Sequence, residues 1–331
     1  MASGVLIFGE FADGAIAGVT GELLGVGRKL ADSLGEELTA AFIGDGIAQD
    51  ASGAFPMGAD KVYVVDDPSL RLYQSESYAD VAEKVLKQVD PNIVVMGTST
   101  MGRDLAPKLA CRLETGLAMD CLELSAVPET KGLIANRPVF GGKAMAEVDC
   151  GSVRPSMATV RLKSQEALDP DSSRSGEVVK VDAGLDPSIA KSIIVDSVQV
   201  EVEGVRLEDA RIVIGGGRGI GSIENWGKLE ELAGIMSGAV GSTRGACDEG
   251  YCELDTQLGI TSKTVAPELY MAVGISGASQ HMSGVAFSKF IIAINKDAEA
   301  PIFRHSLYGV VGRWEDILPA FQAKVQELVS E

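Results

Sequence analysis

The chain has 331 residues, 47 of them acidic and 29 basic, which gives a formal net charge of -18. So negative a protein repels phosphate backbones and anionic lipids, and we expect no nucleic-acid partner and no direct membrane insertion. Hydrophobic residues make up 46% of the chain, which excludes a disordered protein. The acidity itself has two open interpretations: an ordinary acidic surface, or a surface that meets a positively charged partner.

The first part of the chain alternates short apolar runs with helical patterns. Strands are predicted at 5–11, 37–44, 61–67 and 92–100, and helices at 19–35, 77–89 and 103–114. This alternation is typical of an α/β fold with a mostly parallel sheet and flanking helices, of the Rossmann-like or flavodoxin-like type. Residues 119–204 contain strand-like runs with few helical patterns. We expect there an antiparallel addition to the first sheet, or an edge of it.

A second α/β pattern begins near residue 206. Strands followed by loops are predicted at 210–219, 268–278 and 289–297, and helices at 223–234 and 314–331. The charged stretch before this pattern is the natural boundary. We therefore predict an N-terminal α/β domain over 1–205 and a C-terminal domain of the same class over 206–331.

The termini, cysteines and histidines limit the remaining possibilities. The N-terminus lacks a basic region and reaches Glu10 and Asp13 too early for a signal peptide. The five cysteines are irregularly spaced without a CxxC pair, which predicts reduced, mostly buried thiols and neither a zinc site nor an iron–sulfur cluster. Two histidines exclude a His-rich metal site, so we predict no metal. The expected location is the cytoplasm.

Two glycine-containing loops follow predicted strands of the second half. Residues 215–221 read GGGRGIG, a pattern that fits either a tight strand-to-helix turn or a loop that holds a dinucleotide. Residues 276–281 read SGASQH, where small residues let a ligand approach the backbone and free amides at the next helix could seat a pyrophosphate. His281 is open to a structural role or to a position beside the ring of the ligand.

Two further segments place polar side chains at predicted strand ends. Asn295 follows the buried run FIIAI, and Thr243 and Arg244 follow the predicted strand IMSGAV. A lone arginine among small residues suits an anion or a flat, electron-poor ring. Because the carboxyl ends of parallel strands share one edge, the four segments together favour a dinucleotide site.

At this point the sequence resembles a known family. The run PELYMAVGISGASQHMSGVAFSKFIIAINKDAEAPIF at 267–303 is similar to the signature of the electron transfer flavoprotein alpha subunit, a family that includes FixB proteins. GGRGI at 216–220, STRGACDEG at 242–250 and TSKTVAPELY at 261–270 agree with it. GTSTMGRDLAPKLACRL and RPVFGGKAMAEV in the first half also fit. The resemblance covers nearly the whole chain.

The resemblance implies an electron carrier that catalyses no bond-making reaction of its own. Residues 206–331 would hold FAD, and residues 1–205 would meet a beta subunit in a heterodimer. The FAD would accept electrons from flavin dehydrogenases, of the acyl-CoA dehydrogenase type in fatty acid β-oxidation, and pass them onward. The alternative is an electron-bifurcating complex, enzyme-like in character, that uses NADH and carries a second FAD in its beta subunit.

The resemblance also implies roles for individual residues. Arg244 would lie over the isoalloxazine and favour its anionic reduced form, Thr261 would bond near N5, and His281 would stand by N1 and O2 as an imidazolium. The other implied cofactor contacts are Arg218, Thr243, Leu258, Gly259, Ile260, Gly274, Ser276, Gly277, Ala278, Ser279, Gln280, Asn295 and Arg313. Of these, 276–280 would cradle the pyrophosphate and ribityl oxygens, and Asn295 would reach the adenosine.

Four residues in three segments depart from the family pattern. Ile260-Thr261-Ser262 stands where relatives commonly have Gln-Thr-Gly, so one side-chain contact near the flavin is lost or replaced by backbone. Leu307 and Arg313 stand where many relatives have acidic residues. Either the contact with the adenosine ribose changes, or Arg313 meets a phosphate or the partner chain.

Overall fold

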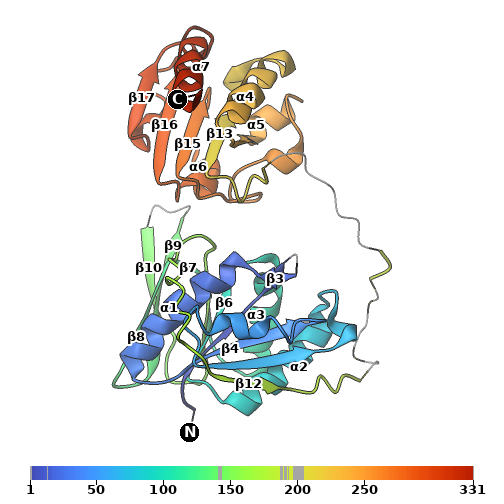
Figure 1. The fold of residues 1–331 in the computed structure, drawn as a ribbon. Coiled ribbons are helices and arrows are strands. Elements are labelled where there is room, and N and C mark those ends of the chain that lie inside the picture. The colour runs from blue at the N-terminus through green and yellow to red at the C-terminus, as the bar shows by residue number, and fades with distance from the viewer. Residues whose placement is uncertain are drawn as a thin grey trace. The chain divides into compact units, whose positions relative to one another are not determined.

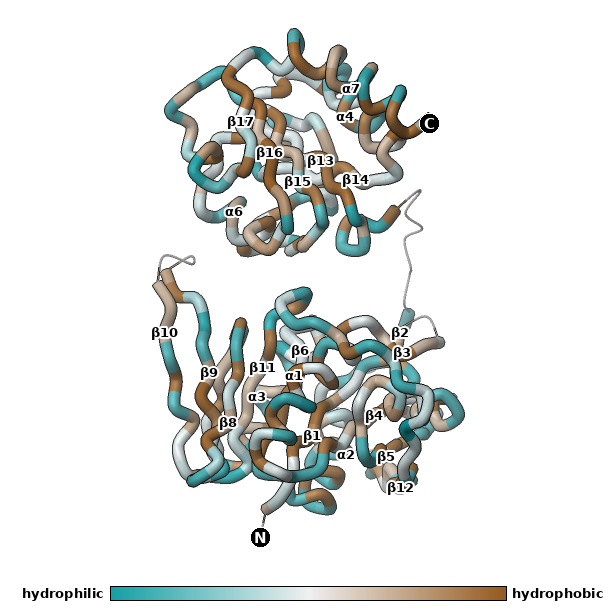
Figure 2. Tube along the Cα trace, turned by 60° about the vertical axis from the view of Figure 1, so that its left-hand side comes forward, coloured by the Kyte–Doolittle hydropathy of each residue, from teal (hydrophilic) through white to brown (hydrophobic). Residues whose placement is uncertain are grey.

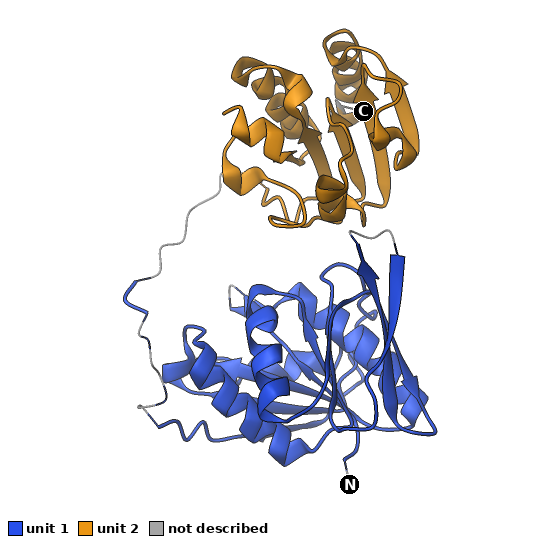
Figure 3. Cartoon of the chain, turned by 180° about the vertical axis from the view of Figure 1, so that it is seen from behind, with its two compact units in different colours: residues 1–197 blue, residues 198–331 orange. Residues whose placement is uncertain are grey.

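The computed structural model describes residues 2–12, 14–140, 144–186, 189, 192, 194–196 and 205–330. The chain divides into two compact units, residues 1–197 and 198–331, which Figure 3 colours blue and orange. Each unit has its own sheets and its own hydrophobic core. The predicted boundary at residue 205 and the roles given to the two domains stay predictions.

Unit 1 is built on a seven-stranded parallel sheet in the order β12-β5-β4-β1-β6-β11-β7. Its strands are β1 (Val5–Phe8), β4 (Leu38–Gly44), β5 (Lys61–Asp66), β6 (Ile93–Gly97), β7 (Leu117–Cys121), β11 (Ser156–Val160) and β12 (Glu177–Lys180). Its helices are α1 (Gly18–Leu34), α2 (Ser75–Val89) and α3 (Thr100–Arg112), with short 3₁₀ turns η1 (Ala51–Ala54) and η2 (Pro68–Leu70).

Both faces of this sheet are covered, which is why its central strands read as continuous apolar runs. The apolar face of α1 packs with Val5 and Ile7 of β1, and α2 and α3 pack with Leu6 and Phe8 on the opposite face. Figure 2 shows the hydrophobic residues running along the strands. Helix α1 ends at Gly35, whose φ of 65° is the left-handed conformation that glycine accepts most easily.

The region after β7 both confirms and corrects the prediction for 119–204. A separate antiparallel sheet forms in the order β10-β9-β8, from β8 (Glu123–Val127), β9 (Gly132–Val139) and β10 (Ala144–Asp149), and β12 is an edge strand. Strand β11, however, lies inside the parallel sheet between β6 and β7. All five of its residues are buried, so it needs cover on both faces. The strand-like run at 192–204 falls largely outside the described residues.

Unit 2 is a five-stranded parallel sheet in the order β14-β13-β15-β16-β17. Its strands are β13 (Ile212–Gly216), β14 (Ala239–Ser242), β15 (Leu269–Val273), β16 (Phe290–Asn295) and β17 (Tyr308–Val311). Its helices are α4 (Ile223–Ile235), α5 (Arg244–Asp248), α6 (Ser279–Val285) and α7 (Trp314–Ser330), with 3₁₀ turns η3 (Arg218–Ile220), η4 (Leu254–Thr256) and η5 (Pro301–Arg304). Helices α4 and α7 cover one face of the sheet and α6 the other (Figure 1).

The predicted fold class, α/β with two parallel sheets and flanking helices, is confirmed. Two details of unit 2 are corrected. The predicted strand IMSGAV is misplaced, because α4 continues to Ile235, Ser237 turns the chain at a φ of 50°, and the strand begins at Ala239. Strand β17 was not predicted, because it is short and all four of its residues are exposed.

The structure also bears on the predicted burial of the cysteines and on whether any helix could cross a membrane. All five cysteines are free thiols, but only Cys121 is buried, so the expectation of mostly buried thiols is wrong. Cys247 and Cys252 are half-buried because they lie at and just after the end of the short surface helix α5. Among the described residues, no helix is both long and apolar enough to cross a membrane.

The short two-stranded sheet β2 (Phe11–Ala12) and β3 (Ala15–Ile16) completes the architecture of unit 1. Phe11 packs edge-on against Phe42 of β4, with ring centroids 5.2 Å apart. This contact holds the segment after β1 against the main core.

Candidate functional site

The order of strands in unit 2 defines where a ligand is expected. The chain passes from β13 to β14 at one edge of the sheet, and then returns to β15 on the other side of β13 (Figure 2). In open parallel sheets, ligands bind outside the carboxyl ends of the strands at this reversal. The loops that follow β13 and β15, which hold the two predicted glycine motifs, meet at this point.

These two loops pack backbone against backbone. The amide of Gly217 donates to the carbonyl of Val273 at 2.9 Å, and a Cβ on Gly217 would lie only 2.1 Å from the carbonyl oxygen of Gly274. Gly277 has a φ of 86°, and a Cβ there would lie 2.3 Å from the amide nitrogen of Ile302. Any side chain at these positions would push the loops apart, so glycine is required by close approach and not only by a turn.

Most of the predicted contact residues surround these loops, and many of their side chains face solvent. Ser276, Ala278, Ser279, Gln280 and Arg218 are exposed. The carbonyl of Ser276 accepts from the amide of Ile302 at 3.0 Å, which fixes the loop from the side of η5. The result is an open, polar rim above the carboxyl ends of β13 and β15.

Helix α5 adds the predicted arginine to the same edge. Arg244 begins this helix directly after β14, and its side chain is 79% exposed, with Asp248 at 3.5 Å as a weak ion-pair partner. A Cβ on Gly245 would lie 3.6 Å from Cβ of Arg218, so α5 and η3 are neighbours. Two guanidinium-bearing residues therefore start from the same corner of the sheet in a chain of net charge -18.

The segment that follows η4 joins β14 to α6. The amide of Leu258 donates to the carbonyl of Ser242 at 2.9 Å, and the amide of Ile260 donates to the carbonyl of Gln280 at 2.9 Å. A Cβ on Gly259 would lie 2.9 Å from that same Gln280 oxygen. Leu258 and Gly259 are buried, whereas the side chains of Ile260 and Thr261 are exposed. Of the two departures from the family pattern in this segment, Ile260 faces solvent and Ser262 is half-buried.

His281 is a buried polar residue of this site. Its Nδ1 lies 3.1 Å from the carbonyl oxygen of Leu258, and its Nε2 lies 2.8 Å from the hydroxyl oxygen of Tyr270. A carbonyl can only accept, so Nδ1 carries the proton and Nε2 accepts from the tyrosine hydroxyl. The two bonds hold the ring in one tautomer.

Burial also affects the charge of this histidine. Burial lowers the pKa of His281 to about 4, and the hydrogen bond to the Leu258 carbonyl opposes this only in part. Burial also raises the pKa of Tyr270, which keeps its hydroxyl protonated as a donor. The surroundings within the chain therefore favour a neutral ring near pH 7. Its contact with the flavin stays a prediction.

Tyr270 was missed by the sequence reasoning, although a signal was present. A tyrosine inside the apolar run of β15 needs a hydrogen-bond partner when it is buried. Its hydroxyl fits because the neighbouring strand has Gly215, where a Cβ would lie 1.9 Å from the hydroxyl oxygen. Gly215, the first glycine of the GGGRGIG motif, thus leaves space for the Tyr270 hydroxyl, which in turn bonds to His281.

Asn295 and Arg313 lie at the same edge but are already engaged within the chain. The amide nitrogen Nδ2 of Asn295 donates to the carbonyl of Ile275 at 2.8 Å and so holds the loop after β15. Arg313 is exposed and pairs with Glu315 at 3.2 Å. Because the Arg313 side chain is 68% exposed, this positive charge is hydrated at the position where relatives commonly have an acidic residue.

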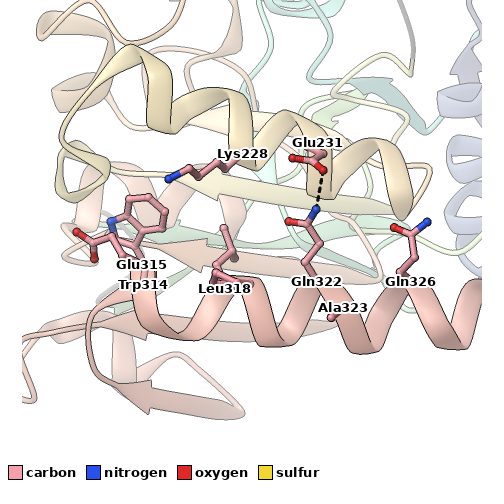
Figure 4. Close-up of a pocket in the computed structure, with 9 residues that line it drawn as sticks. Lys228, Glu231, Trp314, Glu315, Leu318, Gln322, Ala323 and Gln326 are labelled. Carbon is pink, nitrogen blue, oxygen red and sulfur yellow. Dashed lines mark hydrogen bonds between the residues drawn. The ribbon is translucent and has the colours of Figure 1, made fainter.

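A groove of about 570 Å³ lies elsewhere on unit 2, between α4 and α7. In Figure 4, Gln322 bonds to Glu231 at 2.9 Å across this groove, and Lys228 points towards the Trp314 ring, 5.3 Å from its centroid. Its nine lining residues include none of the predicted cofactor contacts. The candidate site is the loop edge and not this groove.

Comparison with known proteins separates the chain into the same two parts. The model of the electron transfer flavoprotein domain matches residues 5–186. The model of the electron transfer flavoprotein FAD-binding domain matches residues 206–286, which include most of the loop edge.

Relatives extend the similarity over nearly the whole chain. An electron transfer flavoprotein subunit alpha of Thermoanaerobacterium thermosaccharolyticum is 40% identical over 324 residues, which are 98% of each chain. That of Bacillus subtilis is 39% identical over 329 residues, 99% of each chain. Protein FixB of Azotobacter vinelandii is 38% identical over 331 residues, 96% of this chain and 91% of the relative. As the signature at 267–303 predicts, the chain belongs to the electron transfer flavoprotein alpha subunit family, and its cofactor is FAD.

Proposed function

We propose that this electron carrier works as a heterodimer with a beta subunit, and that its FAD takes electrons from a dehydrogenase of the acyl-CoA type in fatty acid β-oxidation. When bound, FAD supplies one- and two-electron transfer. The observation that supports the proposal most is the glycine-lined edge between β13 and β15, which lies in the part of the chain that matches the FAD-binding domain. A cytoplasmic location stays a prediction.

The residues at this edge fit FAD. Gly217, Gly274 and Gly277 let the loops of this edge pack backbone against backbone, which fixes the position of the loops that would hold the phosphates. Arg218 and Arg244 supply positive charge next to them, and both side chains are exposed and so within reach of a ligand. We propose that Arg218 lies by the pyrophosphate, that Arg244 and Thr261 lie by the isoalloxazine, and that Asn295 lies by the adenosine.

We further propose that residues 1–205 meet the beta subunit and that residues 206–331 carry the flavin. Large apolar side chains stand exposed in the antiparallel part of unit 1, which supports an interface there. Phe140, which follows β9, is 82% exposed, and Met145 of β10 is 54% exposed. Exposed apolar side chains gathered on one hairpin are typical of protein–protein contacts.

Counting nucleotides in the purified heterodimer tests the proposal. The expected result is FAD and AMP in equal amounts, with flavin bleaching on addition of a reduced acyl-CoA dehydrogenase but not of NADH. Two FAD without AMP, together with bleaching by NADH, would replace the proposal with the bifurcating alternative. A heterodimer without flavin absorption after FAD addition would contradict both.

A further inference from the structure

Two cysteines of unit 2 lie side by side near the loop edge. The Sγ atoms of Cys247 and Cys252 are 3.6 Å apart, and both side chains are half-buried, so both can be reached from solvent. Neither residue has a part in the proposed binding of FAD. Two thiols at this distance can form a disulfide bond with little movement of the backbone.

The end of helix α5 brings these two residues together. Gly250 has a φ of 74° and donates to the carbonyl of Cys247 at 2.9 Å, and Tyr251 donates to the carbonyl of Ala246 at 3.1 Å. This is the Schellman arrangement, in which a left-handed glycine reverses the chain after a helix. The reversal returns residue 252 beside the last turn of α5, so the geometry of the pair follows from the backbone and not from a chance contact.

Hydrogen bonds tie the pair to strand β14. The Cys247 Sγ lies 3.0 Å from the hydroxyl of Ser242, and that hydroxyl also accepts from Thr256 at 3.0 Å. Burial raises the pKa of the Cys252 thiol to about 11, so this sulfur is a protonated thiol near pH 7. Hydrogen bonds and burial therefore hold the two sulfur atoms in place in the reduced pair.

We propose that Cys247 and Cys252 form a redox-active dithiol that reacts with small-molecule disulfides, such as glutathione disulfide, to give a reversible internal disulfide. One cysteine attacks the incoming disulfide, forms a mixed disulfide and releases the first small thiol. The second cysteine attacks the mixed disulfide, closes the internal bond and releases the second small thiol. The protein loses two protons and two electrons, and the small disulfide takes up both.

Mass spectrometry of the full-length chain tests the proposal directly. The tryptic peptide 245–263 contains both cysteines and no other. After incubation in glutathione disulfide and alkylation, we expect this peptide to be lighter by two hydrogen atoms and to carry no alkyl group, and a reducing agent should restore two alkylated cysteines. In Cys252→Ser, Cys247 should instead retain glutathione as a trapped mixed disulfide.

Exposed Cys111 in unit 1 provides the matched control. Cys111→Ser should leave the internal disulfide unchanged, and wild-type Cys111 should carry glutathione under the same conditions. If peptide 245–263 stays doubly alkylated while Cys111 is modified, or if each of its cysteines carries its own glutathione, the proposal is wrong. The readout is thiol chemistry alone, so the proposed function does not enter the result.

Discussion

His281 shows how a single side chain can be tuned by its surroundings in this protein. Its ring is buried, one nitrogen donates to the Leu258 carbonyl, and the other accepts from the Tyr270 hydroxyl. His281 is the last residue of the SGASQH segment, and in the structure it is the third residue of α6. The partner tyrosine could not be assigned from the sequence, because the contact depends on how β15 and α6 pack and on the space left by Gly215.

The charge state of His281 predicts a pH dependence of stability. The folded pKa of about 4 lies below the ordinary value of 6.5, so between these values the unfolded chain binds a proton that the folded chain does not. The stabilisation is complete above about pH 6.5 and is lost as the pH falls towards 4. For unit 2 we expect the wild type to lose about 2 kcal/mol more than His281→Gln between pH 7 and pH 5.

Fluorescence during denaturant unfolding measures this difference. Trp226 and Trp314 are the two tryptophans of the chain, and both are buried in unit 2, so the signal reports that unit alone. His305→Gln, at an exposed position, is the control and should follow the wild type. Parallel pH profiles for the wild type and His281→Gln would contradict a buried, neutral ring.

Arg244 is predicted to affect the redox potential of the flavin. Its exposed guanidinium should stabilise the anionic reduced flavin, so Arg244→Ala should lower the flavin midpoint potential by on the order of 30 mV, roughly a tenfold change for a two-electron couple. Spectroelectrochemical titration of the holoprotein measures it. Arg313→Ala removes a guanidinium that is paired with Glu315, and it should shift the potential less. An unchanged potential in Arg244→Ala would remove this residue from its proposed role.

At the scale of elements, apolar periodicity predicted the long helices and the buried strands well. Helices α1, α2, α3, α4 and α7 and strands β4, β5, β13, β15 and β16 all overlap their predicted ranges. The wrong predictions lie at segments whose burial or chain reversal cannot be read from the local pattern of apolar residues and glycines. Strand β17 is exposed throughout, and the reversal at Ser237 has no glycine at the left-handed position.

The glycine loops are the elements on which the site depends most. In Gly277→Ala, the new Cβ would meet the amide of Ile302 at 2.3 Å while φ is 86°. We expect a loss of about 1–3 kcal/mol in stability and a fall in FAD affinity of at least about tenfold. Unfolding curves and FAD titration measure the two effects.

Gly227→Ala is the matched control for that substitution. Gly227 lies in α4, and a Cβ there would meet nothing within 4 Å. Alanine in an exposed helix position should stabilise unit 2 by about 0.5–1 kcal/mol and leave FAD binding unchanged. Equal FAD affinity in both alanine variants would mean that the loop after β15 does not hold the cofactor.

At the scale of the whole molecule, the sequence predicted two α/β units and the region that would hold the ligand. The alternation of strands and helices carries this information locally, whereas the strand order that creates the reversal at β13 has no local signal. The order β14-β13-β15-β16-β17 depends on which strands pair across the sheet. The sequence therefore predicted that the two glycine loops share an edge of the sheet, but it did not predict that they pack against each other. The net charge of -18 leaves Arg218 and Arg244 as local cations in a negative chain.

Hydrogen–deuterium exchange of the chain with and without FAD tests the central claim most directly, namely that FAD binds at the carboxyl edge of the unit 2 sheet. The amides of 217–221, 242–246, 258–262 and 274–281 should exchange more slowly with FAD bound, because the ligand covers these loops and orders them. The groove residues 314–326 should exchange at the same rate in both states. Protection confined to the groove between α4 and α7, with the four loop segments unchanged, would contradict the account.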